Sequence, residues 1–191
     1  MHRWIQLLFT WVAIFGTTGL AAYAQSTPAT STAPSPGIVR SLLASSPLPS
    51  VVDVPRHFRL VSVNLAEGKT TSYKGPNGFV AVLEGTLDVV LGKEKFSLAK
   101  DEGLHVAAGV NASFKAGAGK PVRFLHYVLA NTAELLAPME KAPAVVAEVA
   151  KTPSISGLKP GPYEFTLARI TFPPRFPFNP PHHRSGAALD Y

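Results

Sequence analysis

The sequence predicts an all-β fold, and three of its features support this prediction. The chain of 191 residues contains 18 prolines and 15 glycines, a composition that suits many turns better than long helices. Between residues 56 and 130, short apolar runs alternate closely with turn residues. No helix-length periodic segment interrupts these runs. We therefore expect an antiparallel barrel or sandwich, because a parallel sheet would need crossover helices.

The first 24 residues predict an export signal. His2 and Arg3 form a short polar start, residues 4–16 are nearly all apolar, and Ala22-Tyr23-Ala24 offers the small side chains of a cleavage site. We expect cleavage after Ala24 and export to the periplasm or the extracellular space, with no stable membrane anchor afterwards. The alternative is a retained anchor, but the apolar run is shorter than the roughly 20 residues that a spanning helix needs.

The amino-acid composition also excludes several classes of function. The chain contains no cysteine, which excludes disulfides, thiolate metal sites and catalytic thiols. Its formal net charge is +6, but the basic residues are scattered singly rather than clustered, so we expect no nucleic-acid partner.

Residues 25–55 are predicted to be a linker and an N-terminal arm. The stretch 25–37 consists almost entirely of Ser, Thr, Ala and Pro and cannot form a packed core. Residues 38–48 follow as either a short helix or an arm that docks on the domain, with apolar contacts from Ile38, Leu42 and Leu43.

The predicted barrel covers residues 56–130. Apolar residues at 58, 60, 61 and 63 begin the first strand, and the runs 79–83 and 86–91 form two strands joined by a tight turn. Further short strands are expected near 96–98, 105–107, 112–115 and 122–129. A connecting segment with short helical turns is expected over 131–162, and the part from 163 to 191 begins with a strand over 163–172.

Three short motifs resemble the cupin superfamily. These are Val82-Leu83-Glu84-Gly85, Lys100-Asp101-Glu102-Gly103 and Ala107-Ala108-Gly109-Val110, and the resemblance covers roughly residues 58–130. It implies a small jelly-roll barrel. In members that perform metal chemistry, it also implies two histidines and a glutamate before the first motif and a third histidine after the last.

Those metal-ligand positions are empty in this sequence. Residues 68–83 contain no His, Asp, Glu or Cys, and Gly78 falls near the place of the glutamate. Residues 107–116 contain no histidine, and Ala112 lies near the place of the third one. A divalent metal needs imidazole and carboxylate ligands that converge on one point, so we expect no cofactor in the barrel.

Four residues are candidates for binding a small molecule. His126 would share one face of its strand with Val122, Phe124 and Val128 and point into the barrel. It could contact a ligand or transfer a proton, or it could be a core or rim histidine that bonds a backbone carbonyl. Tyr73, Lys74 and Asn77 lie in the loop that replaces the metal motif, where they could bind a small polar ligand or simply be solvated.

The C-terminal tail resembles the start of a second, truncated cupin module. His182 and His183 stand among prolines there and could bind zinc, nickel or copper, or could be solvated in a terminal segment. Adjacent histidines in an extended segment point to opposite faces, which disfavours the metal site.

Together these features predict an exported cupin-like protein of unknown ligand with a non-catalytic, small-molecule binding or accessory role. One alternative is a metal-dependent cupin-type enzyme, such as an oxygenase, isomerase or decarboxylase, that uses the tail histidines. The other is a structural homodimerisation module that covers apolar residues near Phe172, Phe176 and Phe178.

Overall fold

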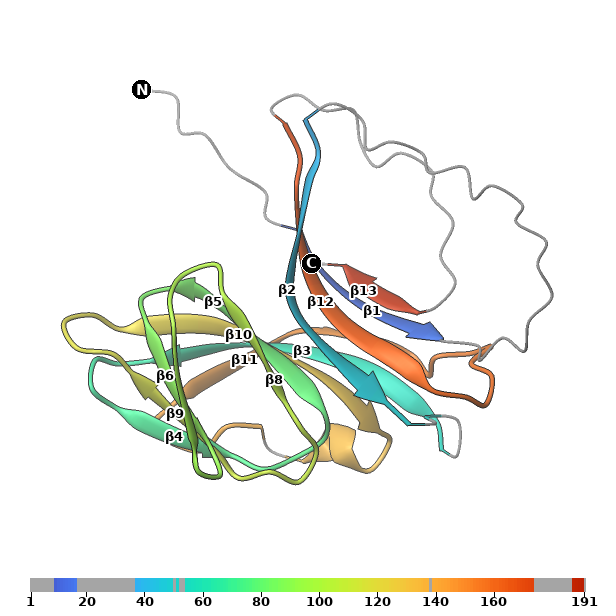
Figure 1. Ribbon diagram of the computed structural model, residues 1–191. Helices are drawn as coiled ribbons and strands as arrows, with labels where there is room; N and C mark the ends of the chain where they lie inside the picture. The colour runs from blue at the N-terminus through green and yellow to red at the C-terminus, as the bar shows by residue number, and fades with distance from the viewer. Residues whose placement is uncertain are drawn as a thin grey trace.

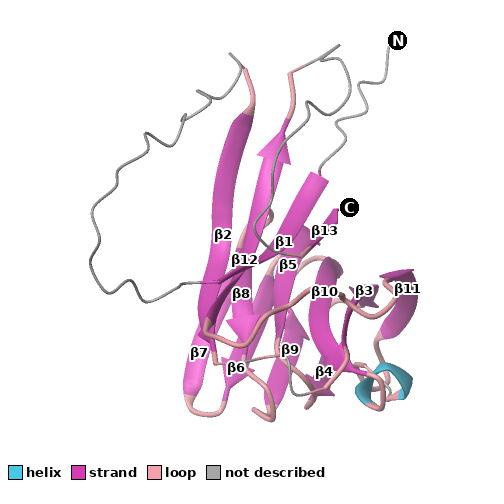
Figure 2. Cartoon of the chain, turned by 90° about the vertical axis from the view of Figure 1, so that its right-hand side faces the viewer, coloured by secondary structure: helices cyan, strands magenta, loops and turns pink. Residues whose placement is uncertain are grey.

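The computed structural model describes residues 9–16, 37–49, 51, 54–137, 139–173 and 187–190. Strands dominate these residues, together with one turn of 3-10 helix (Figure 2). The elements are β1 (Phe9–Gly16), β2 (Val39–Leu48), β3 (Arg56–Leu65), β4 (Thr70–Tyr73), β5 (Gly78–Glu84), β6 (Leu87–Leu91), β7 (Glu94–Leu98), β8 (Gly103–Val106), β9 (Ala112–Ala116), β10 (Val122–Asn131), η1 (Glu134–Leu136), β11 (Val145–Lys151), β12 (Tyr163–Thr171) and β13 (Ala188–Asp190).

Strands β3 to β10 form a jelly roll. The first four strands of this run pair in reverse order with the last four, as β3/β10, β4/β9, β5/β8 and β6/β7, all antiparallel. The rolled-up ribbon makes two facing sheets, β3-β10-β5-β8, which β11 extends beyond β3, and β4-β9-β6-β7 (Figure 1). Two Greek keys in eight strands define the jelly roll, so the predicted all-β, cupin-like fold is confirmed.

The space between these two sheets is filled by an apolar core, which we call the barrel core. On β10 the inward-facing residues are Val122, Phe124, His126 and Val128, as the alternation in the sequence predicted. The facing sheet contributes apolar side chains from β4, β6 and β9, and its buried members include Tyr73, Leu87, Val89 and Phe114.

A second sheet layer, in the order β13-β1-β12-β2, curves over the outer face of the β3-β10-β5-β8 sheet (Figure 1). Between the two layers lies the outer core, in which Phe79 of β5 packs on Phe165 of β12 with ring centroids 4.4 Å apart. Leu125, Tyr127 and Leu129 of β10 also belong to this core. Strand β10 is therefore buried on both faces.

Backbone conformation and close packing explain why the Val-Leu-Glu-Gly motif ends in glycine. Gly85 lies between β5 and β6 with a φ of 80°, a conformation that L side chains rarely adopt. A Cβ at this position would also lie 2.5 Å from the Pro121 carbonyl oxygen. Any side chain here would therefore strain the turn that leads from one sheet to the other.

Two segments for which helical structure was considered are strands. Residues 39–48 form β2, which pairs antiparallel with β12, and Leu43 rather than the exposed Leu42 contacts the outer core. Over 131–162, η1 is one helical turn, but Val145–Lys151 is β11 and pairs with β3. Valines at 145, 146 and 149 favour a strand, and the edge of β3 supplies backbone partners that a local turn cannot offer.

Part of the predicted export signal lies in the second layer. Residues 9–16 form β1, which pairs with β12 on one side and with β13 on the other, whereas the rest of residues 1–24 lies outside the described residues. Within the described part of the chain, no helix has the length and apolar character needed to cross a membrane. Export therefore stays a prediction.

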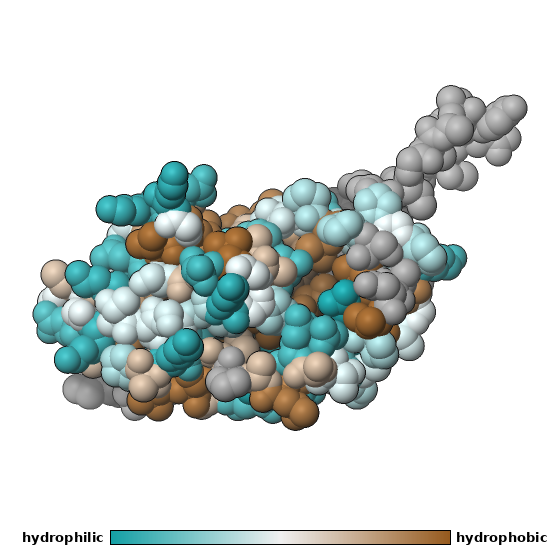
Figure 3. Space-filling model, turned by 90° about the horizontal axis from the view of Figure 1, so that it is seen from below, coloured by the Kyte–Doolittle hydropathy of each residue, from teal (hydrophilic) through white to brown (hydrophobic). Residues whose placement is uncertain are grey.

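The surface of the molecule is chemically mixed. On the face shown in Figure 3, hydrophobic patches lie between hydrophilic ones rather than merging into one continuous apolar area. Leu136 and Val145 are among the exposed large apolar residues.

Candidate functional site

A histidine and a glutamate lie buried together inside the barrel. His126 extends inward from β10, and its Nδ1 is hydrogen-bonded to Oε1 of Glu140. Both side chains have no solvent-exposed surface. Polar groups buried in an apolar core are costly unless they are paired, so each of these side chains stabilises the other in this position.

The chain after β10 is folded so that Glu140 enters the barrel. The Asn131 N–H donates to the Glu134 carboxylate at 2.8 Å, and the Glu134 N–H donates to Oδ1 of Asn131 at 2.9 Å, which fixes the turn at η1. Further on, Lys141 is held on β4, where its N–H donates to the Ser72 carbonyl and its carbonyl accepts from the Thr71 hydroxyl. Glu140, directly before this anchor, therefore faces β10 from the side of β4.

Aromatic rings enclose the imidazole. The Tyr73 ring meets it edge-on, with centroids 4.4 Å apart, and Phe114 does the same at 5.9 Å. The Tyr73 hydroxyl donates to the Pro76 carbonyl at 2.9 Å. Burial, and then the Glu140 carboxylate, raise the pKa of Tyr73 above its ordinary value, because both disfavour the phenolate. Tyr73 thus stays a neutral donor across the physiological range.

Two polar atoms of the pair have no hydrogen-bond partner among the described residues. These are Nε2 of His126 and Oε2 of Glu140, and both are buried. If the His126 Nδ1–H donates to the carboxylate, Nε2 carries a lone pair and Oε2 is also an acceptor. Gly78 of β5 lies close by, since a Cβ there would be 3.0 Å from Nε2. The arrangement can therefore receive hydrogen bonds from a small donor such as water or a hydroxyl or amino group.

The predicted ligand-binding residues separate in the structure. Tyr73 and His126 are in contact, but Lys74 is exposed at the surface. Asn77 has a structural role, since its Oδ1 accepts from the Ala108 N–H and its carbonyl accepts from the Leu129 N–H, both at 2.9 Å. His182 and His183 lie outside the described residues.

The other barrel histidine belongs to a different environment. His105 of β8 lies opposite Phe79 on the face toward the outer core, with ring centroids 5.3 Å apart. Its Nε2 is buried without a hydrogen-bond partner in the described chain, and burial lowers the pKa of His105 from 6.5. His105 is therefore a neutral packing residue and not part of the buried pair.

Glu140 was not predicted from the sequence as a partner of His126. One of the two interpretations of His126 was also wrong about its hydrogen-bond partner. A core histidine was expected to bond a backbone carbonyl, but the structure supplies a carboxylate. Glu140 stands in an irregular segment with Pro138 and Pro143 near it, and neither strand nor helix periodicity points to its orientation. Two glutamates, Glu134 and Glu140, follow apolar residues in the segment after β10, and nothing in the sequence distinguishes the one that enters the barrel.

The metal centre of the cupin superfamily does not fit this barrel. Gly78 and Ala112 carry no donor atoms where ligands were expected, and no three His, Cys, Asp or Glu side chains come together within the described residues. His126 and Glu140 bind each other, and a divalent ion ordinarily requires more ligands than these two.

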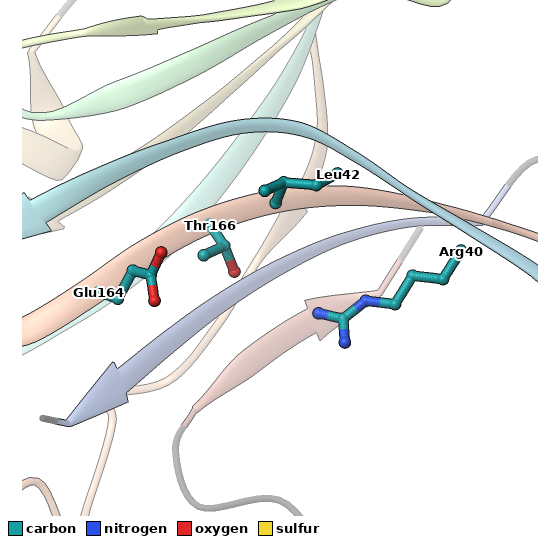
Figure 4. Close-up of a pocket in the computed structure, with 4 residues that line it drawn as sticks. All are labelled: Arg40, Leu42, Glu164 and Thr166. Atoms are coloured by element: carbon teal, nitrogen blue, oxygen red, sulfur yellow. The ribbon is translucent and has the colours of Figure 1, made fainter. Parts of the chain in front are cut away.

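A cavity of about 360 Å³ lies on the second layer, away from the buried pair. Arg40 and Leu42 of β2 and Glu164 and Thr166 of β12 line it (Figure 4). The Glu164 carboxylate accepts a hydrogen bond from Ser45 at 2.6 Å. None of the residues predicted to bind a ligand lines this cavity.

No protein-family model and no curated protein matches the sequence. Among solved structures, the chain is similar to a cupin superfamily protein from Desulfitobacterium hafniense (17% identity, 49% of this chain, 78% of that chain, TM-score 0.34). It is also similar to the cupin_2 domain of an XRE family transcriptional regulator from Enterobacter cloacae (21% identity, 49% of this chain, 96% of that chain, TM-score 0.35). A third similar structure is KdgF from Halomonas sp. (17% identity, 53% of this chain, 87% of that chain, TM-score 0.37).

These similarities cover about half of the chain. The fold is assigned from the strand order of β3 to β10. The protein is a cupin-like jelly-roll protein with a second sheet layer packed on the barrel. Its barrel core holds a buried histidine–glutamate pair.

Proposed function

We propose that this protein is exported and binds a small molecule without catalysing its conversion. The observation that carries the proposal is the buried pair, in which His126 Nε2 and Glu140 Oε2 have no hydrogen-bond partner in the described chain. Buried polar atoms without a partner are rare, and each calls for an explanation such as a bound molecule. A jelly-roll barrel also offers an interior where small ligands commonly bind.

The chemistry of the two atoms indicates the class of ligand. Both accept hydrogen bonds when Nδ1 of His126 donates to Glu140, so the ligand should offer two donors. Sugars, polyols and primary amines meet this requirement, and the adjacent Tyr73 and Phe114 rings provide apolar and cation-π contacts. Because both polar side chains are fully covered, binding requires local opening of the residues that enclose the intact pair.

A non-catalytic role agrees with the surroundings of the pair. The Tyr73 hydroxyl, on the ring that packs against His126, is engaged with the Pro76 carbonyl. Its raised pKa makes it a poor nucleophile. Apart from Glu140, the described neighbours of the imidazole include the Tyr73 and Phe114 rings and Gly78, and none of these is an activated nucleophile.

Binding can be tested with defined probes. A panel of monosaccharides, glycerol and short primary amines would be titrated into ¹⁵N-histidine-labelled protein, and the Nε2 resonance of His126 would be followed together with the melting temperature. We expect at least one class to shift the resonance and raise the melting temperature.

Two variants make the test specific. Binding of an active probe should be lost in His126→Gln and kept in His105→Gln, whose imidazole lies in the outer core. If the active probe binds both variants equally, or if no probe moves the His126 resonance, the proposed site is wrong.

A further inference from the structure

The second layer contains a strand that the predicted export step would remove. Strand β1 (Phe9–Gly16) pairs with β12 over eight consecutive residues, from Phe9 opposite Ile170 to Gly16 opposite Tyr163. Cleavage after Ala24 would take away this whole strand. The edge of β12 that β1 covers would then have no partner in the described part of the mature chain.

The edge left behind is well suited to pairing. Strand β12 is nine residues long and reads YEFTLARIT, with neither proline nor lysine, two of the residues that protect natural sheet edges. Its two charged side chains are engaged within the chain, Glu164 by Ser45 and Arg169 by Asp101. The opposite edge strand of this sheet, β2, does carry a proline, Pro47, within its paired stretch. An exposed, regular edge of this kind readily accepts another strand.

The C-terminal strand is a poor replacement for β1. Strand β13 has only three residues and pairs antiparallel with β1. Since β1 is itself antiparallel to β12, β13 runs parallel to β12. It would have to turn around to form the same ladder, and it would cover only a third of the nine-residue edge.

A second copy of the chain fits the same edge without any such change. Two identical edges related by a two-fold axis perpendicular to the sheet always run antiparallel, which is the direction in which β1 pairs with β12. We infer that the mature protein dimerises through β12, whose edge pairs with β12 of a second copy in the place that β1 occupies in the full chain. The inference depends on cleavage after Ala24 and is independent of ligand binding inside the barrel.

The test compares the full chain with residues 25–191 by light scattering, with circular dichroism as the folding control. We expect folded 25–191 to have twice its own chain mass, and the full chain to be monomeric because β1 fills the edge within the same molecule. A peptide with the sequence of residues 9–16, flanked by lysines for solubility, should convert the dimer to monomers. A scrambled peptide of the same composition should not.

Hydrogen exchange locates the contact. Those amides of Tyr163–Thr171 that point away from β2 should become more protected as the concentration of 25–191 rises. Addition of the 9–16 peptide should keep them protected although the dimer dissociates. Three results would overturn the inference: a folded monomer at every concentration, a dimer that the peptide leaves intact, or a 25–191 chain that does not fold. The last result would mean that β1 is an integral part of the fold.

Discussion

Removal of the Glu140 side chain should destabilise the protein strongly. In Glu140→Ala the His126 imidazole keeps its place in the barrel core but loses its hydrogen bond, and the side chains of both residues are fully buried. Breaking a buried pair by removing one partner costs about 3–5 kcal/mol. Single domains have a free energy of unfolding of about 5–15 kcal/mol, so this one substitution should remove about a fifth of it or more.

Urea unfolding followed by far-UV circular dichroism measures this loss. The matched control is Glu148→Ala, which removes a half-exposed carboxylate that contacts Arg59 at 2.9 Å and should cost no more than about 1 kcal/mol. The double variant His126→Leu/Glu140→Met replaces both polar groups with apolar ones of similar size. It should be far closer to the parent protein than the single variant, since apolar replacement of a buried pair is often neutral or stabilising.

The reasoning fails if Glu140→Ala costs less than about 1 kcal/mol, because the pair would then behave like a surface contact. It also fails if His126→Leu/Glu140→Met loses as much stability as the sum of the losses measured for His126→Leu and Glu140→Met separately. That additivity would mean that His126 and Glu140 act independently.

Three further predictions concern neighbouring features. Gly78→Ala should cost about 1–3 kcal/mol in urea unfolding, because the added Cβ would lie 2.5 Å from the Tyr127 carbonyl oxygen and 3.0 Å from His126 Nε2; a fully stable variant would contradict the close packing. Burial lowers the pKa of His105, so below pH 6.5 the unfolded chain binds more protons than the folded chain. The stability that neutral His105 provides is therefore full above pH 6.5 and declines below it. The melting temperature of His105→Gln should fall less than that of the parent protein on acidification from about pH 7.5 to about 5. Untagged protein 25–191 from a periplasmic fraction should contain no stoichiometric metal by plasma mass spectrometry; bound metal that is lost in His182→Ala/His183→Ala would instead support the metal-dependent enzyme.

The barrel could be predicted from the sequence because its signals are local. Alternation on β10 placed Val122, Phe124, His126 and Val128 on one face, and the structure buries all four in the barrel core. The turn at Gly85 was visible as a glycine between two apolar runs. Strand periodicity and turn chemistry each depend on a few consecutive residues, so one sequence is enough to find them.

The second layer and the partner of His126 depend on distant parts of the chain. Strand β2 is a strand because β12, more than a hundred residues later, supplies its backbone partners. Leu83, the last residue of the apolar run 79–83, is only partly buried because it lies on the margin of the outer core. Glu140 enters the barrel because Ser72 and Thr71 hold Lys141. Such contacts leave no periodic trace in the segment that makes them.

Strand β10 has a consequence for how the protein opens in solution. One face of its backbone holds the barrel core and the other face holds the outer core, and hydrogen bonds join it to β3 and β5 on its two sides. Its amides can exchange with solvent only when both sheet layers separate from it, so the central amides of β10 should exchange through global unfolding. The barrel and the second layer would then unfold as one cooperative unit rather than as two.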